Sequence, residues 1–234
     1  MKILALDCSA GPVSCAVIED GIIKASSFVN TKLTHSQTLL PMVQNTLSSA
    51  MLNITDIDAF AINNGPGSFT GIRIGISAVK GLAIPDNKPC IPVSTLLSIA
   101  YSFLSQNCIV CAVMDARCNQ VYNALFKVED GKVTRLCDDR AVLIAVVLDE
   151  IKNFDLEQII IAGDGADLFI PFTSPQNNII IAKEPLKYQN ACSVALAAEQ
   201  VILTHKPTTP KELSPFYLRL PQAERELKAK GENK

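Results

Sequence analysis

The organisation of this chain follows from one stretch, Asn63-Asn64-Gly65-Pro66-Gly67-Ser68-Phe69-Thr70-Gly71-Ile72-Arg73-Ile74-Gly75. We predict a short apolar strand before it, over residues 57–62, and a helix over residues 70–83 with Thr70 as its N-cap. A glycine-rich turn between a strand and a helix often binds anions, because the first helical turn leaves backbone N–H groups free. This stretch lacks Gly-Lys-Ser/Thr, and its glycines are spaced too widely for the dinucleotide fingerprint. We therefore favour a tight turn that orients the helix over a phosphate site.

The predicted helix over residues 70–83 carries two apolar faces beside a narrow polar stripe. Bulky side chains form one face (Ile72, Ile76, Val79, Ala83), and small ones with a leucine form the other (Gly71, Gly75, Ala78, Leu82). Glycine inside a helix costs about 1 kcal/mol relative to alanine, so Gly75 and Gly81 indicate the close approach of another backbone. The flatter face packs either inside this chain or on another protein, and periodicity alone does not choose between them.

Composition limits the classes of function. At 234 residues and 48% hydrophobic, the chain can bury one large core or two smaller ones. No run approaches the roughly 20 apolar residues of a membrane span, and no signal-peptide layout opens the sequence. Eight cysteines without an export signal indicate thiols in a reducing compartment, so we predict a cytoplasmic protein without membrane attachment. A net charge of -2 and an aromatic content of 6% argue against unaided binding of nucleic acid.

Working outward from the glycine-rich stretch, the same order of elements is predicted twice. In the first half, strands over 3–8, 13–19 and 22–29 precede a helix over 36–51, the strand and helix described above, and a further helix that begins at Ser94 or Thr95. In the second half, strands are predicted over 108–114, 120–127, 132–136, 158–162 and 179–182, and helices over 142–152 and 192–204. The repeated order indicates a duplicated α/β unit with a cleft between its halves. We place the first lobe at 1–105, the second at 106–220, and a charged, flexible tail at 221–234.

Candidates for catalysis are few. The two histidines, His35 and His205, lie in different contexts, and Leu39 stands where a helical metal pair would need its second histidine. Asp7, followed by Ser9, and Asp115 end the first strands of the two halves, where carboxylates facing a cleft could hold a Mg²⁺-nucleotide. An aspartate that caps a turn is the simpler interpretation for both. The sequence therefore predicts no catalytic residue and only these three weak candidates for binding a cofactor.

The sequence closely resembles the bacterial TsaB (YeaZ) family of tRNA threonylcarbamoyladenosine biosynthesis proteins. The resemblance runs to about Arg219 and is most specific in Asn64-Gly65-Pro66-Gly67-Ser68-Phe69-Thr70-Gly71-Ile72-Arg73-Ile74-Gly75. Further matching segments are Ile3-Leu4-Ala5-Leu6-Asp7, His35-Ser36-Gln37, Leu39-Leu40-Pro41, Met114-Asp115-Ala116-Arg117, Val121-Tyr122 and Pro215-Phe216-Tyr217-Leu218-Arg219. The resemblance implies an α/β actin-like fold of the sugar-kinase/Hsp70 (ASKHA) type, with two related lobes that each hold a mixed sheet and flanking helices.

The resemblance also implies a function. Members of this family support the addition of threonylcarbamoyl to N6 of adenosine 37 (t6A37) in tRNAs that read codons beginning with A. In the family, the paralogue TsaD carries the metal and the chemistry, TsaB pairs with TsaD without catalysing, and the ATPase subunit TsaE joins the complex. We accordingly expect a non-enzymatic partner subunit that requires no cofactor, holds ATP or ADP weakly at most, and meets tRNA only through the complex.

Two helices are the contact that the resemblance implies for TsaD, or for a second copy of the chain when TsaD is absent. We predict that the surface comprises Leu40, Val43 and Leu47 of the first helix with Gly71, Ile74, Gly75, Ala78 and Leu82 of the second. On this hypothesis small residues let helices cross closely, and the leucines supply most of the hydrophobic free energy. A bulky residue at Gly75 or Ala78 should then abolish partner binding in a folded monomer.

Two other classes remain open. One is an autonomous ATPase or small-molecule kinase of the same fold, with Asp7 and Asp115 as magnesium ligands. Against it, Arg117, Cys118 and Asn119 stand where active actin-like ATPases carry glycines that admit phosphates, although an arginine can itself bind phosphate. The other is a metallopeptidase, for which two distant histidines supply too few ligands.

Overall fold

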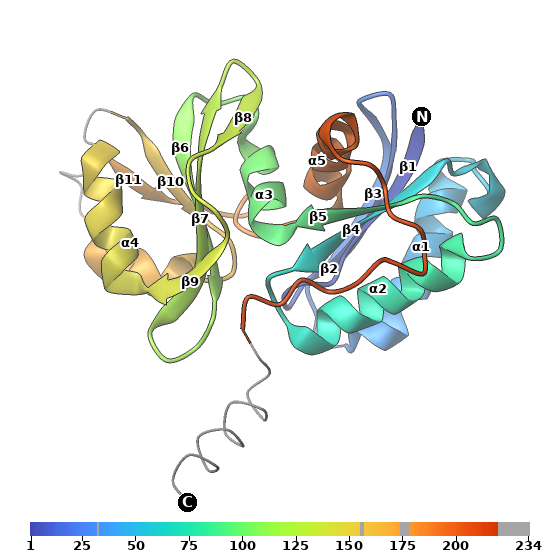
Figure 1. The fold of residues 1–234 in the computed structure, drawn as a ribbon, viewed down its shortest axis with the longest axis horizontal. Helices are drawn as coiled ribbons and strands as arrows, with labels where there is room; N and C mark the ends of the chain where they lie inside the picture. The colour runs from blue at the N-terminus through green and yellow to red at the C-terminus, as the bar shows by residue number, and fades with distance from the viewer. Residues whose placement is uncertain (32, 155–156, 174–177, 220–234) are drawn as a thin grey trace, which may run out of the picture.

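The computed structural model describes residues 1–31, 33–154, 157–173 and 178–219, which fold into two lobes side by side (Figure 1). Each lobe is built on one mixed β-sheet covered by helices on both faces. The two sheets begin alike, with an antiparallel pair whose first strand also pairs in parallel with a later strand. The duplicated order predicted from the sequence is therefore confirmed. The predicted tail at 221–234 lies outside the described residues.

The first sheet has the strand order β3-β2-β1-β4-β5. Its strands are β1 (Lys2–Asp7), β2 (Val13–Glu19), β3 (Ile22–Val29), β4 (Ala59–Gly65) and β5 (Cys90–Ser94). The first three form the predicted meander, and β4 and β5 continue it in parallel. Helices α1 (His35–Ser49) and α2 (Phe69–Ala83) cover one face, where Leu4, Phe60 and Ile72 are among the buried side chains.

The second sheet has the order β11-β10-β6-β7-β8, with β9 paired to β7. Its strands are β6 (Cys108–Asp115), β7 (Gln120–Glu129), β8 (Lys132–Arg135), β9 (Arg140–Leu143), β10 (Ile159–Ala162) and β11 (Ile179–Ile181). The short helix α3 (Thr95–Ala100) packs on one face, and α4 (Ile144–Ile151) packs on the other together with the 3-10 segment Ala166–Phe172. Shorter 3-10 turns lie at Ile54–Asp56, Tyr101–Phe103 and Lys152–Phe154.

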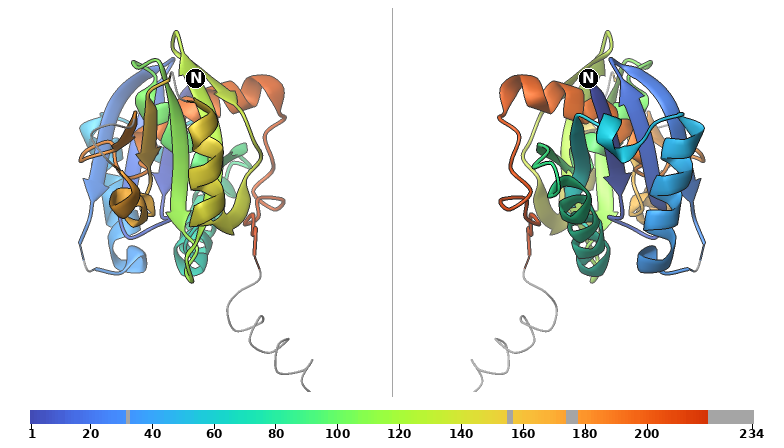
Figure 2. Two further views of the ribbon diagram at one scale, coloured as in Figure 1. Left: turned by 90° about the vertical axis from the view of Figure 1, so that its left-hand side faces the viewer. Right: turned by 90° about the vertical axis from the view of Figure 1, so that its right-hand side faces the viewer.

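The C-terminal helix returns to the first lobe, which corrects the domain boundary predicted from the sequence. Helix α5 (Ala191–Thr204) covers the face of the first sheet opposite α1 (Figure 2, right). Its alanines and Val194 pack on Ile3, Ala5 and Ala16 of that sheet, and small side chains on both partners let the helix lie close. Residues 205–219 then run beside α2 towards the second lobe (Figure 1). The second lobe predicted over 106–220 therefore ends before α5.

Three local expectations differ from the structure. Helix α2 is capped by Ser68 rather than Thr70, because the Ser68 hydroxyl accepts a hydrogen bond from the Gly71 N–H at 3.2 Å. Strand β5 was missed because it contains Pro92, which is tolerated on the edge strand that β5 forms. Strand β9 precedes α4 where the helix was predicted to begin at residue 142.

Among the described residues, no helix combines the length and apolar character needed to cross a membrane.

Candidate functional site

A cleft of about 490 Å³ opens between the two lobes. Residues 9–11, His35 and residues 67–69 line it on the first lobe, and residues 114–117, Tyr122 and Asp164 line it on the second. The Gly-Pro-Gly turn after β4 and the turn after β6 therefore face one another across it. Of the two strand-end aspartates predicted to face a cleft, Asp115 lines it and Asp7 does not.

Asp7 is buried and serves the first lobe as a structural acceptor. Its Oδ1 accepts hydrogen bonds from the Ser9 hydroxyl at 2.6 Å and from Asn63 Nδ2 at 2.8 Å, so it ties β1 to β4. Burial raises the pKa of the Asp7 carboxyl, and the hydrogen bonds from Ser9 and Asn63 only partly oppose this. Ser9 is equally buried, and its Oγ accepts from Gln189 Nε2 at 3.1 Å. Both residues are thus held in a network beneath the cleft.

Asp115 lies on the opposite wall and caps the turn between β6 and β7. Its Oδ1 accepts from the Arg117 N–H at 2.7 Å, and its Oδ2 pairs with the Arg117 guanidinium at 3.1 Å. Arg117, Cys118 and Asn119 all adopt positive φ, at 66°, 54° and 56°. Such φ values favour glycine, so these three non-glycine residues hold a strained backbone conformation at this turn. Within the described ranges, no group of three or more His, Cys, Asp or Glu side chains is arranged to hold a metal.

A further acidic residue, Asp164, also lines the cleft. It lies between Gly163 and Gly165 and lines the cleft near Asp115 and Asp7. A Cβ at Gly163 would lie 1.9 Å from the Val113 carbonyl oxygen, so this loop packs directly on β6. Burial, reinforced by the two neighbouring carboxylates, raises the pKa of Asp164 to about 6. The glycine on each side of Asp164 was the signal that could have indicated a close-packed position.

A groove of about 580 Å³ runs between α1 and α2 on the outer surface of the first lobe. Its lining consists of Ser36, Leu39, Leu40, Thr70, Arg73, Ile74, Ser77 and Ala78. Leu40 is 53% exposed, while Ile74, Ala78 and the nearby Leu82 are half-buried. The two predicted docking helices therefore lie side by side and present an apolar surface to the outside.

Half of the predicted docking residues do not belong to that surface. Val43 and Leu47 are only 4% and 7% exposed, because they pack into the core beneath α1. A Cβ at Gly71 would lie 2.0 Å from the Cys8 carbonyl oxygen, and one at Gly75 would lie 2.9 Å from Ile62 Cδ1. These glycines let α2 approach its own sheet, so they are not available to a partner. A bulky residue at Gly75 would press on Ile62, so we now expect it to disturb the packing of α2 on its own sheet as well as any docking.

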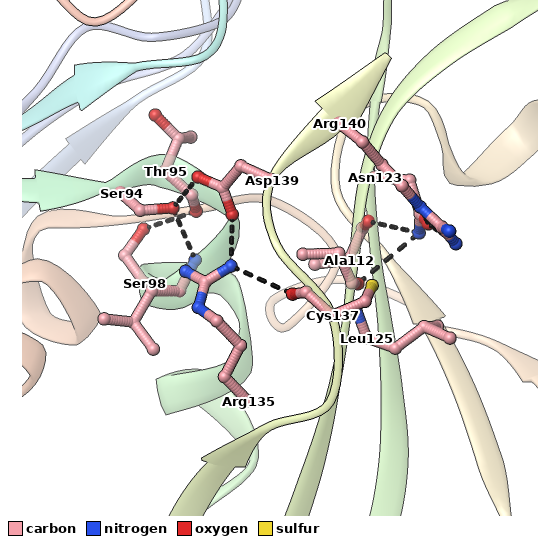
Figure 3. Close-up of polar contacts among 12 residues, drawn as sticks. Ser94, Thr95, Ser98, Ala112, Asn123, Leu125, Arg135, Cys137, Asp139 and Arg140 are labelled. Atoms are coloured by element: carbon pink, nitrogen blue, oxygen red, sulfur yellow. Dashed lines mark hydrogen bonds and ion pairs between the residues drawn. The ribbon is translucent and has the colours of Figure 1, made fainter. Parts of the chain in front are cut away.

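A polar network that the sequence did not reveal joins the lobes near α3 (Figure 3). Ser94, at the end of β5, donates to Asp139 Oδ2 at 2.5 Å, and Arg135 holds the other oxygen of Asp139. On the neighbouring strands, Arg140 donates to Asn123 Oδ1, and Asn123 Nδ2 donates to the Ala112 carbonyl at 3.1 Å. The loop between β8 and β9 is thereby fixed against the first lobe.

The duplicated lobes and the cleft between them place the chain in the class of actin-like proteins. The ROK hexokinase from Thermus thermophilus shares this fold, with a TM-score of 0.50 at 10% identity over 86% of this chain and 100% of that chain. The family model described as "TsaD: tRNA N6-adenosine threonylcarbamoyltransferase" matches residues 29–226. The tRNA threonylcarbamoyladenosine biosynthesis protein TsaB of Escherichia coli K12 is 31% identical over 221 residues, which cover 94% of this chain and 95% of that protein.

The chain belongs to the TsaB family of tRNA threonylcarbamoyladenosine biosynthesis proteins. The crystal structure of YeaZ from Pseudomonas aeruginosa agrees with this, with a TM-score of 0.78 and 25% identity over 93% of this chain and 99% of that one. The family and the ASKHA fold predicted from the sequence are confirmed.

Proposed function

We propose that this chain is a non-catalytic subunit that supports t6A37 modification of tRNA by binding the catalytic paralogue TsaD through the groove between α1 and α2. The observation that carries the proposal is the uncovered apolar surface of that groove, formed by Leu40, Ile74 and Ala78, with Leu82 nearby on α2. Nothing in the described part of the chain packs over the groove. Full burial of an exposed leucine side chain contributes about 1.5–3 kcal/mol, so Leu40, with smaller contributions from the half-buried Ile74 and Ala78, can anchor a partner.

The cleft supports the non-catalytic part of the proposal. One oxygen of Asp7, Oδ1, accepts hydrogen bonds from Ser9 and Asn63, while its buried Oδ2 has no hydrogen-bond partner among the described residues; Asp115 forms an ion pair with Arg117. His35 bonds the Gly11 carbonyl through Nε2 at 3.1 Å, and Leu39, where a helical metal pair would need its second histidine, is buried in the core. These residues serve local structure, and the chemistry is assigned to TsaD.

The wider assembly follows from family membership. We propose that TsaE joins the complex of this chain with TsaD and that the assembly works in the cytoplasm. This chain contacts tRNA only as part of that complex. Without TsaD, the same groove supports a homodimer, because two copies would cover the same apolar residues on each other.

Two substitutions test the docking groove. Leu40→Asp and Ala78→Trp each alter a groove residue whose side chain reaches the surface, so the monomer should remain folded. We expect each to weaken TsaD binding by about 2 kcal/mol or more, roughly 30-fold or greater, in titration calorimetry. Leu203→Asp is the matched control, since Leu203 is exposed on α5 outside the groove. Unchanged TsaD affinity in both groove variants would show that the surface is misassigned.

The size of the cleft keeps a second candidate open, an autonomous ATPase or small-molecule kinase. Its volume of about 490 Å³ accommodates a small ligand, and the Asp115 carboxylate lines it. ATP turnover by the purified chain alone, lost in Asp115→Asn, would favour this candidate. Absence of such turnover, together with loss of TsaD binding in the groove variants, favours the docking function.

A further inference from the structure

The motif Pro215-Phe216-Tyr217-Leu218-Arg219 is explained neither by the cleft nor by the groove alone. Residues 216–219, here called the strap, lie at the end of the segment that runs beside α2 (Figure 1). The Phe216 N–H donates to the Asn64 carbonyl at 2.8 Å. A Cβ at Gly65 would lie 2.1 Å from the Phe216 carbonyl oxygen, so the strap rests directly on the backbone of the glycine-rich turn.

Tyr217 attaches the strap to the start of α2. Its ring lies 4.8 Å from the Phe69 ring, centroid to centroid, and its hydroxyl accepts a hydrogen bond from Arg73 Nε at 2.7 Å. Phe69 lines the cleft, whereas Arg73 lines the docking groove. One side chain therefore contacts both surfaces of the first lobe.

The next two residues attach the strap to the second lobe. Leu218 packs on the core that contains Met114 and Ala116. The Arg219 guanidinium donates to the Ala116 carbonyl at 3.0 Å and also to Gln120 Oε1. Ala116 and Gln120 are the two ends of the turn that carries Arg117, and this turn forms the second-lobe wall of the cleft.

We propose that the strap is a latch that sets the angle between the lobes and so positions α2 against the second lobe. Three consecutive side chains connect Phe69 and Arg73 on one wall to Ala116 and Gln120 on the other. Elsewhere the chain passes between the lobes near Ser94 and again between β11 and α5, so the strap is a third connection. Tyr217 and Arg219 are positioning residues that act through α2 and the turn after β6.

The role of α2 in this inference rests on the proposed docking function, whereas the effect on lobe angle does not. Arg73 donates a hydrogen bond to Tyr217 and also lines the docking groove. A partner that binds Arg73 therefore also perturbs the contact between α2 and the strap. Lobe angle and partner affinity are therefore coupled.

The lobe angle can be measured in the isolated full-length chain. Two dyes attached through unnatural amino acids at exposed Met51 on the first lobe and exposed Lys152 on the second report the inter-lobe distance by single-molecule energy transfer. We expect Arg219→Ala and Tyr217→Ala to broaden and shift this distance distribution, and Arg219→Lys to restore it in part. Lys206→Ala, an exposed change before the strap, is the control and should leave the distribution unchanged.

A folded Arg219→Ala chain with the wild-type distance distribution would overturn the latch. If that variant does not fold, Gln120→Ala removes one acceptor of Arg219 and must broaden the distribution in its place. Because the measurement uses no partner, failure of the docking proposal leaves its result intact. Conversely, Ala78→Trp should lose TsaD binding without changing the distance, which separates the two failures.

Discussion

At the scale of single residues, three carboxylates lie in or beneath the cleft, and their surroundings differ. Asp7 is buried and accepts hydrogen bonds, Asp115 forms an ion pair with the exposed Arg117, and Asp164 is half-buried near both. Burial and the neighbouring negative charges both disfavour the ionised form of Asp164. Its effect on stability should therefore be visible as a pH dependence.

We predict that Asp164→Asn stabilises the protein at pH 8 and does so less at low pH. The folded-state pKa is about 6, against an ordinary value of 3.8, so the folded protein binds this proton more tightly than the unfolded chain does. Protonation of Asp164 stabilises the folded protein below about pH 4, and this stabilisation is lost as pH rises towards 6. The loss is about 2 kcal/mol after allowance for partial exposure, and asparagine avoids it. Urea unfolding of both proteins at pH 4.5 and pH 8 measures the difference; an equal gain at both values contradicts the raised pKa.

At the scale of elements, the glycines of α2 differ in what surrounds them. Gly71 faces the backbone of Cys8, whereas a Cβ at Gly81 meets nothing within 4 Å. Close packing therefore requires glycine at position 71, whereas no packing contact requires it at position 81. Periodicity identified both faces of α2, but only the structure shows that the small-residue face is partly turned to its own sheet.

This difference gives a matched pair of substitutions. Gly81→Ala should stabilise the protein by about 0.5–1 kcal/mol, because alanine is the better helix former and the site is open. Gly71→Ala should destabilise it by roughly 1–3 kcal/mol, because the Cys8 carbonyl cannot give way cheaply. Thermal unfolding of the two variants against wild type checks the signs. Equal effects at the two positions would contradict the packing assigned to α2.

How far the sequence predicts the structure also depends on the element. The meander of β1, β2 and β3 was predictable because turn residues and strand patterns are local signals. Strand β5 was not, since Pro92 counts against a strand until the edge position is known. The candidate site divides in the same way. Leu40 is exposed, and Ile74, Ala78 and Leu82 are partly exposed, so they remain candidates for docking, whereas Val43 and Leu47 are buried in the core.

At the scale of the whole molecule, the return of α5 and the strap to the first lobe could not be predicted from local pattern. Helix α5 is apolar and alanine-rich, which indicates burial but not the sheet that buries it. As a result, the two sheets repeat one plan, but the C-terminal segment joins them. The α1–α2 groove stays on the outer surface of the first lobe, and the C-terminal segment contacts both lobes beside the cleft.

The account's central claim is that this chain acts by docking on TsaD and not by chemistry in its own cleft. The most direct test is the rate of t6A formation in a reconstituted mixture of TsaD, TsaE, tRNA, threonylcarbamoyl-adenylate and this chain. With Leu40→Asp or Ala78→Trp in this chain, we predict that the rate falls to the level without the chain, whereas Asp115→Asn retains it. Full activity of both groove variants, or loss of activity in Asp115→Asn with TsaD binding intact, would contradict the claim.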